Sequence, residues 1–315
     1  MKRLLIIDGH AILHRAFHAI PPNFKANGGT PTNAIYGFVS MFLRVMETVK
    51  PDYVVVAFDL PQPNFRQQIY TQYQKKRPEM AGNLSEQIPL VFELLDRLKI
   101  KHFEVGGYEA DDVIGTISRL ATENEEVETI IVSGDRDLLQ LVNEKVKVMV
   151  PLKGLSETKT YGIEQVKNEF GVLPSQWIDV KALKGDGSDN YPGVRGIGPK
   201  TALDLIAKYE TLEELYRRID EIDKKVAIKL ATYVEDAGMA KKLATIVCDV
   251  PLVKLDLNEL VVSEIDWENG VRFMRGELGF RSLVEKIEKD YMKIELKLTK
   301  KEKIKKDNED QMGLF

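Results

Sequence analysis

Glu109, Asp111 and Asp112 lie within four residues of one another, directly before an apolar run at residues 113–121 that has the pattern of a helix. Carboxylates in the first turn of a helix interact favourably with its dipole, so an acidic first turn without further function is one interpretation. A metal site is the other, because carboxylates at short range raise one another's pKa unless a cation neutralises them. This stretch alone leaves both interpretations open.

Four further stretches of the sequence also end in one or two aspartates. Each aspartate follows an apolar, strand-like run or a glycine turn, and such repetition favours one site assembled from distant stretches over several unrelated acidic turns. The candidate metal ligands are Asp8, Asp59, Glu109, Asp111, Asp112, Asp135, Asp137, Asp186 and Asp189.

The chemistry of such a site follows from its ligands. Oxygen ligands without nitrogen or sulfur select Mg²⁺, with Mn²⁺ as a substitute, and leave part of the metal shell to water and substrate phosphate. Two such ions about 4 Å apart clamp the attacking and leaving oxygens of an in-line phosphoryl displacement. We therefore expect phosphodiester hydrolysis with two or more Mg²⁺ ions.

A zinc site is an alternative, because His10, His14 and His18 are spaced by four and would line one face of a helix. However, no cysteine partner and no HExxH pattern accompanies them. We expect these histidines to pack or to face solvent.

Short apolar runs at residues 4–8, 53–58, 101–105 and 129–133 are typical of strands buried on both faces of a parallel sheet. Runs at helical spacing alternate with them, at residues 33–49, 84–98 and 113–121. This order predicts an α/β fold with a mainly parallel central sheet and helices on both faces. Asp8, Asp59 and Asp135 would then lie beyond the carboxyl ends of strands, where ligands bind in such sheets.

The chain divides into three parts by composition. Residues 1–162 carry the α/β pattern, with a possible hairpin from 145–150 and 157–161. Residues 163–292 are almost wholly helical in pattern. Residues 293–315 are rich in lysine and lose the apolar period, so we expect a disordered tail.

Two stretches have the character of nucleic-acid contacts. Residues 193–201 place glycines in a tight turn before a helix at 202–209, so backbone N–H groups can bind phosphate; an ordinary Gly-Pro loop is the alternative. Residues 65–78 interleave aromatic and cationic residues, as single-stranded nucleic acid favours. The candidate DNA-binding residues are Arg66, Tyr70, Tyr73, Lys76, Arg195, Gly196, Gly198, Lys200 and Thr201.

The composition is neutral on nucleic-acid binding, because a formal charge of -4 averages over segregated acidic and basic stretches. Cys248 is the single cysteine, which excludes a disulfide framework, and no apolar run reaches the length of a membrane span. We expect a cytoplasmic protein, a monomer without membrane association.

In these motifs and their order, residues 1 to about 289 resemble the 5′ nuclease domain of bacterial DNA polymerase I, in the flap endonuclease superfamily. The motifs are Asp8 with Arg15, Asp59, residues 107–112, Asp135 with Asp137, Asp186 with Asp189, and residues 193–201. The resemblance implies a PIN-like nuclease core, a helical arch at about 60–83, and a helix-three-turn-helix at about 182–210 that grips duplex DNA and is associated with K⁺.

The resemblance also implies an activity. The expected reaction is 5′-3′ exonuclease and 5′ flap endonuclease cleavage in DNA replication and repair, on branched or nicked DNA and on RNA primers. Arg15, Lys75 and Arg77 would be its catalytic cations. Gln74 departs from the pattern, because the family has a phosphate-contacting lysine there, and we expect Lys75 to take over.

Two rival functions remain. A DNA-structure binder of the same fold would have lost its carboxylates, yet none is replaced here. A ribonuclease of the RNase H or PIN type would lack the glycine turn and the Asp186/Asp189 pair.

The last residues suggest a partner. Gln311, Met312, Leu314 and Phe315 resemble the bacterial clamp-binding pentapeptide, so we expect the tail to bind the sliding clamp. No polymerase follows, so we also expect a stand-alone nuclease.

Overall fold

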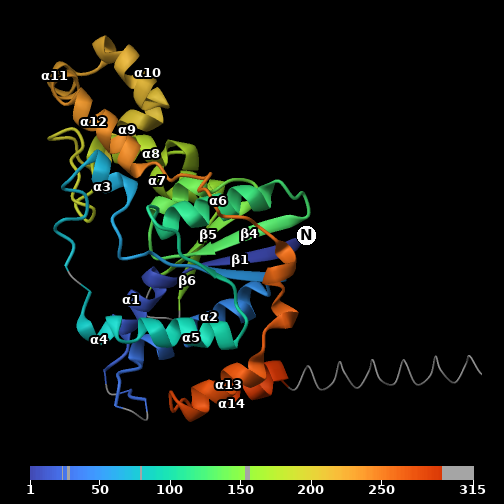
Figure 1. Cartoon of the computed structure of the whole chain (residues 1–315). Coiled ribbons are helices and arrows are strands. Elements are labelled where there is room, and N and C mark those ends of the chain that lie inside the picture. The colour runs from blue at the N-terminus through green and yellow to red at the C-terminus, as the bar shows by residue number, and fades with distance from the viewer. Residues whose placement is uncertain (23, 27–28, 79, 153–156, 293–315) are drawn as a thin grey trace, which may run out of the picture.

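The structure is a computed structural model that describes residues 1–22, 24–26, 29–78, 80–152 and 157–292 (Figure 1). The expected tail at 293–315, with its clamp-binding peptide, lies outside the described residues. Among the described helices, none is long and apolar enough to cross a membrane.

A six-stranded sheet forms the centre, in the order β3-β2-β1-β4-β5-β6. Five strands are parallel, and β6 pairs antiparallel with β5, so the predicted mainly parallel sheet and the hairpin are both confirmed. The strands are β1 (Lys2–Asp8), β2 (Tyr53–Ala57), β3 (His102–Phe103), β4 (Val127–Val132), β5 (Val146–Pro151) and β6 (Thr158–Tyr161).

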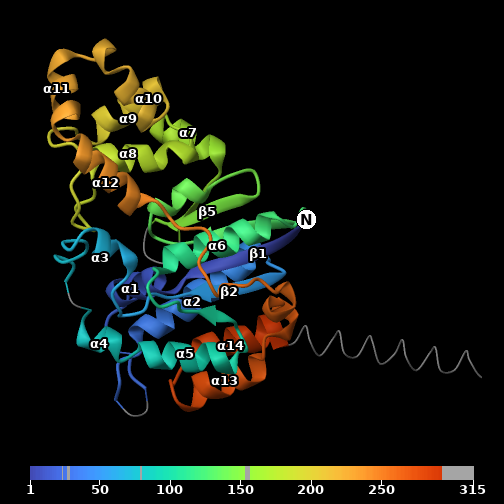
Figure 2. The ribbon, with the colours of Figure 1, turned by 45° about the horizontal axis from the view of Figure 1, so that its top comes forward.

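Helices cover both faces of the sheet, as expected (Figure 2). The helices are α1 (Gly9–Ala19), α2 (Asn33–Val49), α3 (Phe65–Ile69), α4 (Gly82–Ser85), α5 (Ile88–Arg97), α6 (Ala110–Thr122), α7 (Ile163–Phe170), α8 (Trp177–Lys184), α9 (Pro199–Tyr209), α10 (Leu212–Arg217), α11 (Lys224–Thr232), α12 (Val234–Ala244), α13 (Trp267–Gly276) and α14 (Ser282–Ile287), with a 3₁₀ turn η1 (Asp137–Leu141).

Alternate residues of β1 supply the two cores. Leu4 and Ile6 pack with α6 on one face, whereas Leu5 and Ile7 pack with α2 and α5 on the other. A continuous apolar strand therefore needs helices on both sides, which is why the run at residues 4–8 predicts a central strand.

The C-terminal helices lie in two separate parts of the structure. Helices α7 to α12 lie beyond one face of the sheet, and the chain then returns to the opposite face (Figure 2). On the way Val262 N–H donates to the Asp52 carbonyl at 2.9 Å, and Asp266 N–H donates to the Leu98 carbonyl at 3.0 Å. Helices α13 and α14 pack against α2 and α5, so part of the stretch 163–292 shares a core with the α/β half.

The stretch expected as a helical arch contains little helix. Among its described residues, α3 is five residues long and turns follow it before α4. Gln74 has a φ of 55°, a left-handed conformation that interrupts a right-handed helix. The described part of the arch segment is therefore mostly turns and not a continuous helix.

Helices α8 and α9 flank the glycine turn, in the helix-loop-helix arrangement that the sequence predicts. Two backbones meet closely here, because Val194 N–H donates to the Leu183 carbonyl at 2.8 Å. Gly185 has a φ of 69°, and Gly193 lies against it. The loop that carries Asp186 and Asp189 depends on this contact.

We expect Gly193→Ala to lower the free energy of unfolding by roughly 1–3 kcal/mol, as overpacking does. A Cβ at Gly193 would lie 2.3 Å from Gly185 N and 2.5 Å from the Leu183 carbonyl oxygen, and backbone atoms cannot swing aside. Urea unfolding measures the change. Gly187→Ala is the matched control, because nothing lies within 4 Å of its added Cβ. Equal stability of the two variants would contradict the close contact.

Candidate active site

The carboxylates gather where the sequence predicts, at the carboxyl edge of the parallel strands. Asp8 ends β1, Asp59 follows β2 by two residues, and Asp135 follows β4 by three. Strands β1 and β4 are neighbours from which the sheet winds in opposite directions. This is the topological switch point, where open α/β sheets bind ligands.

Asp111 joins these three aspartates from the first turn of α6. Burial and the carboxylates of Asp135 and Asp8 raise the pKa of Asp111 well above its usual range. Asp8, Asp59, Asp111 and Asp135 are called the strand-end group below. No lysine or arginine among the described residues forms an ion pair with this group.

Hydrogen bonds orient the strand-end group. Asp8 accepts from the Ser133 hydroxyl at 2.6 Å and from Ala11 N–H at 3.0 Å. Asp59 accepts from Ala110 N–H at 2.8 Å. The carboxylates are thus held in place by short backbone and hydroxyl contacts, an arrangement that prepares ligands for a metal. Burial raises the pKa of Asp8 to about 7, with Asp59 and Asp135 adding to the effect.

Asp137, Asp186 and Asp189 form a second set, called the loop group. One oxygen from each lies within 4.8 Å of the others, close enough to share a cation. Burial and the charge of Asp135 raise the pKa of Asp137 to about 7. Burial acts in the same direction on Asp186, but bonds from Lys181 and Ser188 outweigh it and hold the pKa of Asp186 below its usual value.

The loop group already contains a cation from the chain itself. The Lys181 ammonium lies 2.5 Å from Asp137 Oδ1 and pairs with Asp186 as well. Burial alone would lower the pKa of Lys181, yet these two carboxylates hold it above its usual value. The strand-end group has no such partner in the part of the chain that the structure describes, so its need of a bound cation is greater.

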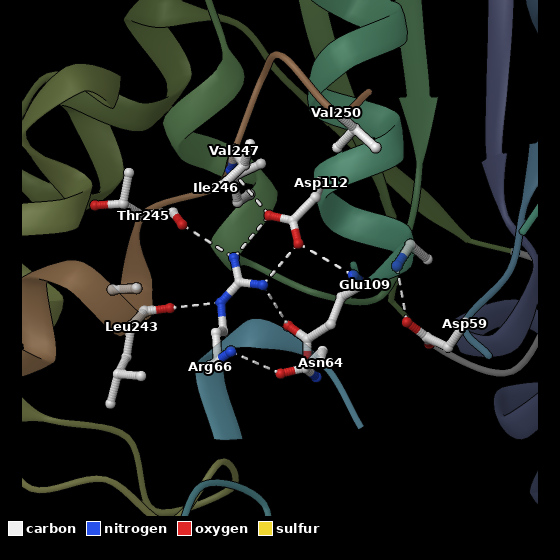
Figure 3. Close-up of polar contacts among 12 residues, drawn as sticks. Asp59, Asn64, Arg66, Glu109, Asp112, Leu243, Thr245, Ile246, Val247 and Val250 are labelled. Atoms are coloured by element: carbon white, nitrogen blue, oxygen red, sulfur yellow. Dashed lines mark hydrogen bonds and ion pairs between the residues drawn. The ribbon is translucent and has the colours of Figure 1, made fainter. Parts of the chain in front are cut away.

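Asp112 is not a metal ligand in this arrangement, which corrects the prediction. It is fully buried, and its two oxygens accept from Arg66 Nη1 and Nη2 at 2.7 Å each (Figure 3). Glu109 N–H and Val247 N–H donate to the same carboxylate at 3.1 and 2.9 Å. Its hydrogen-bonding capacity is used within the protein.

Arg66 and Tyr73 also depart from prediction, because they are not placed to contact DNA. Arg66 is 2% exposed and Tyr73 is 4% exposed. Tyr73 stacks on Tyr191 with 6.1 Å between ring centroids, and its hydroxyl donates to Glu109 at 3.1 Å. Tyr70 is half-buried and packs against the apolar cluster that contains Tyr73 and Tyr191.

Gln74 bridges the acidic residues in a way that the sequence did not predict. Its side-chain amide donates to Glu109 Oε1 at 2.9 Å and to Asp189 Oδ1 at 3.1 Å. Burial raises the pKa of Glu109 to about 7, with Arg66 opposing the shift. Glu109 thus lies at the border of the site, bonded mainly to residues 64–74.

The remaining predicted cations lie near the site or at the surface. Arg77 Nη2 is 3.7 Å from Asp189, and its side chain is 56% exposed. Lys75 and Lys76 are exposed beside it. Arg15 lies on α1, where it donates to the Leu152 carbonyl at 2.7 Å.

The glycine turn is available to a large ligand. Arg195, Gly196, Gly198 and Lys200 are exposed, and Thr201 is half-buried. Gly198 is the N-cap of α9, so the free N–H groups of that helix start at the turn.

The histidines have other partners, so the zinc alternative gains no support. His10 Nδ1 accepts from Asp59 N–H at 3.0 Å, and burial lowers the pKa of His10. The rings of His14 and His18 contact each other at 4.6 Å between centroids. Within the described part of the chain, the one three-ligand group contains aspartates alone.

Ser133 and Lys181 are the site residues that the sequence reading missed. Ser133 comes directly after the apolar run of β4 and two residues before Asp135, and a hydroxyl at a strand end beside an aspartate is a usable signal. Lys181 sits in an apolar helix one turn before Gly185, and no pattern marks it.

The raised carboxyl pKa values predict how the metal-free protein responds to pH. A carboxyl whose pKa is higher in the folded than in the unfolded chain holds more protons when folded, so stability falls as pH rises from about 4 to about 7. We expect Asp8→Asn to reduce the loss between pH 5 and pH 8 by roughly 1–3 kcal/mol. Urea unfolding in chelator measures it.

The control for this experiment is Asp96→Asn, an exposed aspartate of α5. Adding Mg²⁺ should stabilise the unmodified protein more at pH 8 than at pH 5, since the ion competes with protons. A pH slope that is the same for Asp8→Asn and the unmodified protein would contradict the assignment.

Two family models match consecutive parts of the chain. Residues 3–171 match the N-terminal resolvase-like domain of 5′-3′ exonuclease, and residues 172–268 match its C-terminal SAM fold. DNA polymerase I of Bacillus subtilis (strain 168) is 38% identical over 290 residues, 92% of this chain and 32% of that protein. DNA polymerase I of Caldicellulosiruptor bescii is 42% identical over 287 residues, 90% of this chain and 33% of that protein. The chain spans about a third of the length of these relatives.

Solved structures share the fold. T5 5′-exonuclease with bound zinc has a TM-score of 0.65 at 20% identity, over 93% of this chain and 99% of that one. The catalytic core of Rad2 in complex with DNA substrate has a TM-score of 0.59 at 20% identity, over 91% and 90%. The expected α/β fold with a helical second region is thereby confirmed, and with it the resemblance noted from the motifs. The chain belongs to the 5′-3′ exonuclease family.

Proposed function

We propose that this protein is a structure-specific 5′ nuclease, a 5′-3′ exonuclease and 5′ flap endonuclease that acts in DNA replication and repair. The observation that carries the proposal is the strand-end group, in which four carboxylates from three strand ends and one helix start converge, with no lysine or arginine of the described residues in an ion pair with them. The family and the exposed glycine turn support DNA as the substrate.

The residues present fit divalent metal ions. Asp137, Asp186 and Asp189, whose oxygens lie within 4.8 Å of one another, are spaced to share one ion in place of Lys181. Asp8, Asp59, Asp111 and Asp135, which interact electrostatically at the strand ends, would close around another. All ligands are carboxylates, and this set favours Mg²⁺, with Mn²⁺ as a substitute. Ions bound there would supply hydroxide at neutral pH and stabilise charge on the leaving oxygen.

The chain's own residues would position the substrate. The N–H groups at the start of α9, with Lys200 and Arg195, would bind the duplex backbone without reading sequence. Exposed Lys75 and Arg77, beside Asp189, would bind phosphates of the 5′ strand. Arg15 would be a further phosphate contact, as the family resemblance implies.

We also propose that the glycine turn binds a potassium ion. Such an ion would bind backbone carbonyl oxygens of the turn. The Gly196 carbonyl accepts a hydrogen bond from the Lys229 ammonium at 3.1 Å, so a cation can reach this oxygen. Thermal unfolding in KCl and in NaCl tests whether K⁺ adds stability there.

We also propose three properties of the protein from its sequence alone. These are action on RNA–DNA junctions, a monomeric cytoplasmic protein, and a clamp contact through Gln311, Met312, Leu314 and Phe315. Pull-down by the bacterial sliding clamp, with and without residues 311–315, tests the last of them. The alternative of a DNA-structure binder without catalysis is less well supported, since every strand-end carboxylate is present.

Cleavage of a 5′-labelled double-flap substrate tests the proposed function. We expect cleavage with Mg²⁺ or Mn²⁺ and none with chelator. Asp111→Ala or Asp135→Ala should abolish cleavage while flap binding in Ca²⁺ survives, because these carboxylates act on the transition state and the duplex is held elsewhere. Glu268→Ala is the control, because Glu268 is an exposed residue of α13, which packs on the opposite face of the sheet. Cleavage that resists chelator, or loss of binding together with cleavage in a folded variant, would count against the proposal.

The arch segment gives a second prediction. We expect Lys75→Ala and Arg77→Ala to slow single-turnover cleavage on the order of 10²-fold each, since both would lose a cation near the reacting phosphate. Gln74→Lys should retain or raise the rate. Lys99→Ala, an exposed lysine outside the site, serves as control. An unchanged rate for Lys75→Ala would show that Lys75 does not replace the family lysine.

A further inference from the structure

Arg66 is the most completely bonded buried cation of the site region. Its guanidinium donates to both oxygens of Asp112 at 2.7 Å and pairs with Glu109 at 3.0 Å (Figure 3). Nε donates to the Leu243 carbonyl and Nη2 to the Thr245 carbonyl, each at 2.9 Å. All three of its nitrogens have partners, as a buried arginine requires.

These bonds join three stretches that are distant in sequence. Arg66 belongs to α3, and Glu109 and Asp112 belong to the start of α6. Leu243 lies in the last turn of α12, and Thr245 follows that helix directly. Residues 243–250 are called the strap below. The strap is fixed along α6, because Val247 N–H donates to Asp112 at 2.9 Å and Val250 N–H donates to Thr116 at 3.0 Å.

The same turn of α6 holds part of the strand-end group. Asp111 lies between Glu109 and Asp112 in sequence, and its buried carboxyl interacts electrostatically with Asp135 and Asp8. Ala110 N–H, in this turn, donates to Asp59 at 2.8 Å (Figure 3). A shift of the turn would therefore displace Asp111 and release Asp59 together.

We propose that Arg66 is a positioning residue for the strand-end group. It fixes the first turn of α6 through Asp112 and Glu109, and it couples that turn to the strap and thus to the helices α8 to α12. Arg66 touches no reacting atom. The inference rests on the proposed function only for its catalytic readout.

The rival role for Arg66 is simple neutralisation of buried Asp112. Removing one partner of a buried ion pair leaves an unpaired charge and destabilises the fold, whereas removing both charges restores much of the stability. A pair of variants separates the roles: Arg66→Met, and Arg66→Met with Asp112→Asn.

Three measurements are made on each variant: the Tm without metal, Mn²⁺ affinity by calorimetry, and kcat and KM on a flap substrate. We expect Arg66→Met to lower the Tm by roughly 10 °C. The double variant should recover most of the Tm, yet Mn²⁺ affinity and kcat should remain about 10–100-fold below the unmodified protein, with KM little changed.

Arg119→Met is the matched control. Arg119 also donates from α6 to the strap, at the Cys248 carbonyl, but it contacts nothing in the first turn. It should keep the Mn²⁺ affinity and kcat of the unmodified protein.

A double variant with unmodified Mn²⁺ affinity and kcat would overturn the proposal, because Arg66 would then only neutralise Asp112. The same holds if Arg119→Met loses as much Mn²⁺ affinity as the double variant. An unmodified protein that cleaves no DNA would end the proposed function, whereas the Mn²⁺ titration would still decide the role of Arg66.

Discussion

Mutual repulsion among buried carboxylates is the constraint on which this structure depends. The seven carboxylates of the strand-end and loop groups gather near one edge of the sheet with Glu109 and Asp112 beside them, and burial makes charge there more costly as well as strengthening the repulsion. The chain offsets part of that cost with Lys181 in the loop group and Arg66 beside Asp112. Among the described residues, no lysine or arginine forms an ion pair with the strand-end group, and an exchangeable cation would meet the greatest need there.

The sheet makes this gathering possible with few residues. Parallel strands bring Asp8, Asp59 and Asp135 to one edge automatically, since their carboxyl ends all point the same way. Helix α6 adds Asp111 from its first turn, where the helix dipole favours a negative charge. The loop between α8 and α9 then brings Asp186 and Asp189, which the close contact of Gly185 with Gly193 holds in place.

The sequence predicted the sheet and the approximate site because strand ends can be located from apolar runs. It did not separate Asp111 from Asp112, which are successive residues on a helix and point about 100° apart. One reaches the strand-end group and the other reaches Arg66, and this choice depends on the rotation of α6. Arg66 and Tyr73 were predicted to contact DNA but are buried, for a related reason. An alternation of aromatic and cationic residues does not indicate which of the side chains point into the protein.

The two kinds of countercharge serve different needs. A cation from the chain, such as Arg66 or Lys181, is present in every state and so stabilises the fold without responding to substrate. A bound ion can leave open positions for water and phosphate, which a guanidinium with every N–H in use cannot do. Permanent cations at the rim and exchangeable ones at the centre therefore let the same acidic edge be both stable and reactive. The hydrogen bonds from Arg66 to the strap also connect distant parts of the molecule, because they link the rim of the site to the helices proposed to hold the duplex.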